Sequence, residues 1–120
     1  MKTIYKYNIS PGQGGIARVK MPKNAVVMHS DANESGLFVW ALVDIKAETE
    51  NRYFGLFQTG QKLPDSIADC ILIKTFVTRL LTKAPVVPGD MPEFKTCVDH
   101  LWEVSAKTVK ELREIHNQTN

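Results

Sequence analysis

The 120-residue sequence has little of several residue types that would define its class. It contains 2 cysteines, 7 glycines and 6 prolines, and its 15 basic residues nearly balance 13 acidic ones, giving a net charge of +2. Two cysteines, Cys70 and Cys97, are too few for the disulfide framework of a small secreted domain, so we expect reduced thiols. The basic excess typical of proteins that bind duplex nucleic acid is missing, and we expect no such partner.

Long apolar runs are missing as well. No run approaches the roughly 18 apolar residues that a membrane span requires. The start of the chain, Met1-Lys2-Thr3-Ile4-Tyr5, lacks the apolar core of a signal peptide. We therefore expect a cytoplasmic protein with no membrane partner. The content of 43% hydrophobic and 23% charged residues is ordinary for globular proteins, and the length suits one domain over residues 1–120.

Short segments rich in β-forming residues fill the first half of the chain. The expected strands cover residues 3–9, 16–20, 25–29, 37–43 and 52–59. The glycine-rich stretch from Pro11 to Gly15 is expected to be the turn of a hairpin between the first two. The regular spacing of strands and turns predicts an antiparallel meander.

The segment Leu37–Val43 is apolar at all seven positions, without alternation. Such a strand is expected to be buried on both of its faces. Because a single helix covers one face of a sheet, the second face needs another cover.

Residues 66–82 are ambiguous. Ile67, Cys70, Val77 and others could share a helical face after Ser66, but Ile71, Ile73 and Thr75 are β-branched, which favours a strand. We predict a sixth strand over residues 70–79. The sheet of five to six strands then occupies residues 1–80. Residues 81–91 form an irregular connection because they contain Pro85 and Pro88.

A helical period begins after this connection. Apolar side chains recur in steps of three and four, which predicts a long amphipathic helix over residues 92–117, through Phe94, Val98, Leu101, Val109 and Leu112. The expected fold class is α+β, an N-terminal antiparallel sheet followed by a C-terminal helix. A helix of about 25 residues would be about 37 Å long and would overhang strands of about 20 Å.

The overhang and the two-sided strand together predict a homo-oligomer, most simply a dimer, in which two chains complete each other's cores. Residues 81–91 folded over the second face of the sheet would be the monomeric alternative.

No catalytic constellation is evident, and we expect neither an enzyme nor a cofactor. His29, His100 and His116 are dispersed, and Cys97 and His100 would place only two metal ligands on one helical face. The Gly12–Gly15 turn lacks the Gly-Lys-Ser/Thr ending of a phosphate-binding loop.

Two groups of residues could bind a ligand. Lys110 and Arg113 lie on the late helix, where the alternative is a solvated face paired with neighbouring Glu residues. Phe76 and Arg79 precede the irregular connection and could stack a base and grip a phosphate, or simply end a strand. Trp102 is a candidate stacking wall beside the helical stripe.

Several motifs resemble a family of small phage and prophage proteins of unassigned function. They are Lys2-Thr3-Ile4-Tyr5-Lys6-Tyr7, Met21-Pro22-Lys23, the Trp-Ala-Leu-Val-Asp block from Trp40 to Asp44, and the segment Phe54–Gly60. The resemblance covers about residues 1–80 and leaves the expected helix outside. It implies a phage-encoded protein.

The expected plan of an N-terminal sheet and an oligomer-building helix is also similar to phage Thoeris anti-defence sponges. That resemblance in architecture implies a counter-defence protein that sequesters a cyclic nucleotide or cyclic ADP-ribose-type immune signal at an oligomer interface, without catalysis. The candidate ligand-binding residues are then Phe76, Arg79, Trp102, Lys110 and Arg113. The alternative is a protein-interaction module, either an inhibitor of a host defence protein or a minor phage structural component.

Overall fold

The structure, a computed structural model, describes residues 1–119, which form seven strands, two short 3-10 segments and one α-helix. This confirms the α+β class, although the strands number seven instead of five to six. The strands are β1 (Lys2–Ile9), β2 (Ile16–Pro22), β3 (Val26–Asn33), β4 (Gly36–Asp44), β5 (Thr49–Gln58), β6 (Ile71–Lys83) and β7 (Glu93–Val104), followed by helix α1 (Ala106–Thr119); the 3-10 segments are η1 (Gln13–Gly15) and η2 (Asp65–Asp69).

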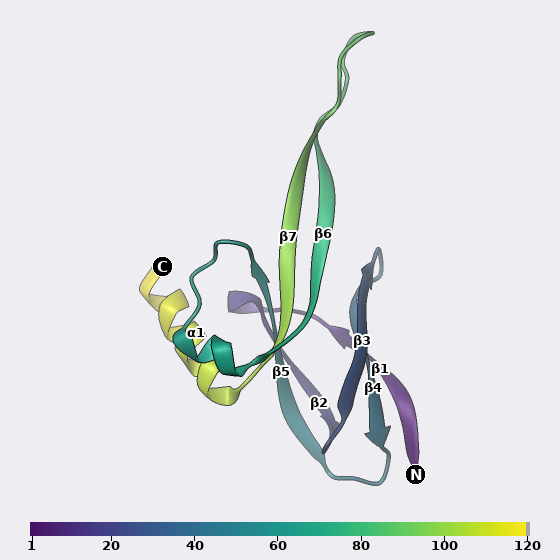
Figure 1. Cartoon of the computed structure of the whole chain (residues 1–120), viewed down its shortest axis with the longest axis vertical. Helices are drawn as coiled ribbons and strands as arrows, with labels where there is room; N and C mark the ends of the chain where they lie inside the picture. Colours follow the sequence, from purple (N-terminus) through teal and green to yellow (C-terminus); the bar gives the residue numbers. More distant parts are fainter. Residues whose placement is uncertain (120) are drawn as a thin grey trace.

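The strands form two antiparallel sheets, not a single meander (Figure 1). The first sheet has the order β1-β4-β3 and the second the order β2-β5-β7-β6. The predicted hairpin between the first two strands is wrong, because β1 pairs with β4 and β2 pairs with β5. The glycine-rich stretch between them carries the chain from one sheet to the other, with Gly14 and Gly15 at positive φ.

The main core lies between the two sheets. It gathers buried apolar side chains from both: Ile9, Ala17, Val19, Met21, Ala25, Val39, Ala41, Val43, Phe54 and Leu101. Alternate residues of β4 supply its centre. The burial of these β4 side chains accounts for the apolar character of the strand from Leu37 to Val43, which is central in its sheet.

The other face of the first sheet is only partly covered. Ile4, Leu42 and Val26 lie side by side across β1, β4 and β3, and Ile4 and Val26 are more than half exposed. Lys6 Nζ lies 4.0 Å from the ring centre of Phe38. The expected burial of β4 on two faces is therefore incomplete within one chain.

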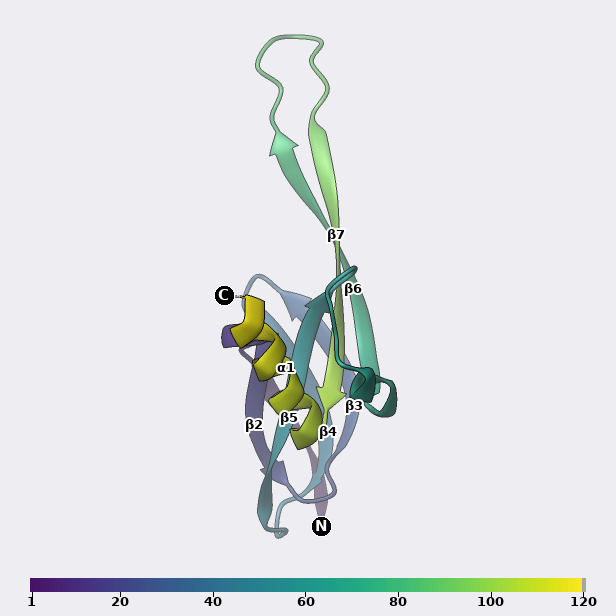
Figure 2. The same ribbon diagram turned by 90° about the vertical axis from the view of Figure 1, so that its left-hand side faces the viewer.

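Helix α1 covers the second sheet instead (Figure 2). Val109 and Leu112 pack with Phe57 and Val104 in a second buried cluster. Ser105 caps the helix, because its Oγ accepts a hydrogen bond of 3.1 Å from the backbone N–H of Thr108. At 14 residues the helix is about 21 Å long. Among residues 1–119 we find no helix with the length and apolar character needed to cross a membrane.

The predicted helix over residues 92–117 is wrong in its first half. Residues 93–104 form β7, which is hydrogen-bonded to β5 on one side and to β6 on the other. Phe94 and Val98 lie on the predicted helical stripe and Trp102 lies beside it, but all three also fit the two-residue alternation of a strand. Pairing with β6 along its length and with β5 over residues 99–104 provides hydrogen-bond partners for the backbone of β7, and this outweighs local helix preference.

The sixth strand is confirmed, and it extends beyond the predicted residues 70–79 to Lys83. Residues 81–91 do not fold over the sheet, because the ends of β6 and β7 continue away from the body as a hairpin (Figures 1 and 2). We call residues 77–97, including the loop 84–92, the arm. It accounts for the long dimension of a molecule measuring 61 × 37 × 20 Å. The arm, and not a helix, overhangs the sheets.

Candidate functional site

The two expected β6 residues lie on opposite faces of their strand. Phe76 is half-buried and packs against the core between the sheets, with Lys74 Nζ 5.1 Å from the centre of its ring. Arg79 lies on the arm, and its guanidinium carbon is 3.9 Å from the ring centre of Phe94. Two positions that are three residues apart on a regular strand lie on opposite faces of it, so these two side chains cannot bind one ligand together.

The other three expected residues lie on the helix side of the second sheet. Trp102 belongs to β7, not to a helix, and packs against the cluster beneath α1. Lys110 and Arg113 are exposed on α1, as predicted for the late helix. The structure therefore divides the five residues between the arm, the core and the helix. Cys97 and His100, considered as two metal ligands on one helical face, lie on opposite faces of β7.

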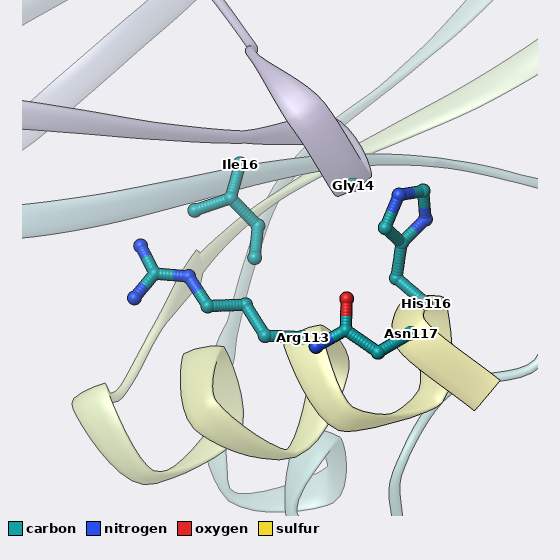
Figure 3. A pocket seen from close by; sticks show the side chains of 5 residues that line it. All are labelled: Gly14, Ile16, Arg113, His116 and Asn117. Carbon is teal, nitrogen blue, oxygen red and sulfur yellow. The ribbon is translucent and has the colours of Figure 1, made fainter. Parts of the chain in front are cut away.

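Arg113 lines a small cleft at the end of α1 (Figure 3). The cleft has a volume of about 320 Å³ and is bordered by Gly14, Ile16, His116 and Asn117 as well. The guanidinium of Arg113 in this cleft could hold an anionic group. The volume lies at the lower limit for small-molecule sites, so the cleft suits a phosphate or part of a nucleotide better than a whole cyclic dinucleotide.

A second cavity, of about 670 Å³, lies between the edge strands β3 and β6. Arg52 and Glu103 line it and form a two-pronged ion pair, with Nε and Nη2 each 2.7 Å from a carboxylate oxygen. The hydrogen bonds that Arg52 donates to Glu103 raise the pKa of Arg52, and burial opposes that shift. Arg52 also donates to the backbone carbonyl of Ala25. The pair joins β5 and β7 to the start of β3, so its role is structural.

The arm is the most unusual surface of the molecule. Its side chains contribute nothing to either buried cluster, and Val77, Val86 and Met91 are 69%, 83% and 79% exposed. Its loop is nevertheless a defined turn, since Asp90 Oδ2 accepts hydrogen bonds from the backbone N–H groups of Val86 and Val87. Exposed apolar side chains on an ordered projection are typical of a surface that contacts another protein.

No metal site is apparent in the part of the chain that the structure describes: residues 1–119 contain no group of three His, Cys, Asp or Glu side chains placed to hold an ion. Cys70 and Cys97 are both free thiols.

Comparison with known proteins identifies one family. A protein-family model described as a domain of unknown function (DUF7352) matches residues 1–83. No curated protein matches, and no solved structure matches. The match stops at the last residue of β6, yet β7 lies between β5 and β6 in the sheet. The place of β6 in this chain thus depends on a strand outside the matched region.

Proposed function

The chain belongs to the DUF7352 family, whose function is unknown, and we propose that it is a non-enzymatic protein-interaction module that binds other polypeptides through its arm. The observation that supports this proposal is the projection of the β6–β7 hairpin beyond the body (Figure 1). Several apolar side chains of this hairpin are exposed.

The energetics of hairpins support this function. A two-stranded hairpin without a packed face is only marginally stable in water, because it buries little apolar surface. The arm keeps Val77, Leu80 and Leu81 in water at 49% exposure or more. A partner that covers them would stabilise the arm and gain affinity from the same apolar surface. Helix α1 is less suited to this role, because Val109 and Leu112 are already buried against the second sheet.

Selection of binders from a random peptide library tests the proposal. The protein would be compared with a shortened variant in which an Asn-Gly turn replaces residues 78–97, closing the hairpin after Val77. None of the removed side chains belongs to a buried cluster, so the variant should fold and melt near the temperature of the native chain. We expect selected peptides to bind the native chain and to lose binding to the shortened variant. Equal binding to both proteins would contradict the proposal.

A second candidate function rests on the Arg113 cleft. The guanidinium of Arg113, in the cleft that Gly14 also lines, could hold the phosphate of a signalling nucleotide, as expected of a phage counter-defence protein that sequesters an immune signal. Thermal melts against cyclic nucleotides and ADP-ribose derivatives test this function, because a tight ligand stabilises the folded state by mass action. A shift that Arg113→Ala removes and Lys107→Ala preserves would support it. No shift with any compound would eliminate it.

A further inference from the structure

We infer that the free edge of β6 on the arm binds an extended, acidic segment of a partner polypeptide as an added β-strand. This inference rests on the proposed function and specifies the chemistry of the partner. It begins from the backbone of β6, which is an edge strand with β7 as its hydrogen-bonded neighbour.

The edge of β6 is regular where it leaves the body. Register shifts interrupt its pairing between Leu72 and Lys74 and again between Leu81 and Lys83, while the pairing from Lys74 to Leu81 is continuous. Lys74 still belongs to the body, since its Nζ donates to the carbonyl of Ser30. Beyond it, the outer N–H and C=O groups from Phe76 to Leu81 are available for a ladder with another strand.

The usual protection of an edge is weak in this segment. Proline, inward-pointing charge and lysine commonly prevent unwanted strand pairing. Between Thr75 and Thr82 there is no proline, and Arg79 is the one charged residue. Its guanidinium lies over the ring of Phe94, on a face of the arm and not across the edge. The opposite edge of the arm, formed by the start of β7, is less suited to binding a strand of one charge, because Glu93 and Lys95 give it mixed charge.

The charge of β6 determines which kind of partner strand can pair with its free edge. β6 carries three basic residues, Lys74, Arg79 and Lys83, and no acidic residue. A second copy of β6 in the same ladder would add three further cations and no carboxylate, and like charges opposite each other destabilise a strand pair. An acidic strand instead places carboxylates beside Arg79. The exposed side chains of Val77 and Leu81 on that face would receive apolar residues of the partner.

A set of matched peptides provides the test. An eight-residue peptide, Val-Thr-Glu-Thr-Val-Thr-Glu-Thr, presents Val and Glu in turn on one face of a strand and Thr on the other, and its counterparts carry Gln or Lys in place of Glu. A fourth peptide keeps Glu but has alternate backbone amides methylated, so that it cannot form a ladder. Binding of labelled peptides would be followed by fluorescence anisotropy at low and at physiological salt. We expect the Glu peptide to bind at least about tenfold more tightly than the Gln peptide, and the Lys and methylated peptides not to bind.

Two variants locate the contact. Arg79→Gln should remove most of the preference for Glu over Gln, whereas Lys95→Gln, on the neighbouring strand of the arm, should preserve it. Equal binding of Glu, Gln and Lys peptides would overturn the inference, as would binding of the methylated peptide. Self-association of the native chain that Arg79→Gln strengthens would also overturn it and would identify a second copy as the occupant.

Failure of this inference can be distinguished from failure of the proposed function. If the library peptides bind only when the arm is present but are neutral or basic, the proposed interaction function stands and the inference of an acidic partner strand is overturned. Peptides that bind equally well without the arm would overturn both.

Discussion

The ring of Phe57 lies directly over the backbone of Gly55, two residues earlier in β5. A Cβ added at Gly55 would overlap two atoms of that ring and lie 3.0 Å from a third. Phe57 is 1% exposed and belongs to the cluster that α1 covers. The glycine thus lets an aromatic side chain fold back over its own strand, in the centre of the sheet that holds the base of the arm.

Gly55→Ala should destabilise the protein by about 1–3 kcal/mol, because the Phe57 ring must move out of a packed site. Gly12→Ala is the matched control, since a Cβ there would meet its nearest atom at an ordinary 3.7 Å. Urea unfolding measures both free energies. A loss of the same size in the two variants would show that Phe57 does not require the glycine.

Glu103→Gln should reduce the free energy of unfolding by about 2–3 kcal/mol. The substitution removes the carboxylate that pairs with the Arg52 guanidinium, in a site where the side chains of Arg52 and Glu103 are 14% and 20% exposed. Glu48→Gln breaks the Lys23–Glu48 pair, whose side chains are 53% and 86% exposed, and should cost under about 1 kcal/mol. Chemical denaturation of the two variants in parallel checks the difference. Comparable losses would contradict a structural role for the Arg52 pair.

The predicted homo-oligomer now rests on the outer face of the first sheet. Ile4, Leu42 and Val26 form an apolar row there that α1 does not cover. We expect light scattering to give a dimer and Ile4→Lys to give a monomer, because a charge in a buried interface lacks a partner. Val86→Lys, at the tip of the arm, should remain dimeric. A monomeric native chain at micromolar concentration would end this prediction.

The sequence predicted most strands but not their partners. Segments rich in β-forming residues mark β1 to β5, whereas the burial of Leu37–Val43 on both faces, predicted from its missing alternation, is incomplete within one chain. Pairing depends on contacts far apart in the chain, and neighbouring strands are only the commonest partners. The turn at Gly14 therefore suggested a hairpin, although β1 and β2 lie in different sheets.

The arm escaped prediction because residues 93–104 satisfy two periods at once. Phe94, Val98 and Leu101 fit helical steps, and Phe94, Thr96 and Val98 fit a strand. The helical interpretation placed Trp102, as a candidate stacking wall, on the same helix as Lys110 and Arg113. Of these, Arg113 does line a cleft, and residues 106–117 are helical both in the prediction and in the structure. The ladder with β5 and β6 decides the conformation of β7, and β5 is far from it in sequence, since Tyr53 pairs with Val104.

Hydrogen–deuterium exchange with a library-selected peptide is the most direct test of the central claim that the arm is the binding surface. We predict that the peptide slows exchange at alternate backbone amides between Phe76 and Leu81, the pattern of an added strand, and leaves the end of α1 unchanged. Protection around Gly14 and Arg113, with none on β6, would contradict the claim and favour the cleft at the end of α1.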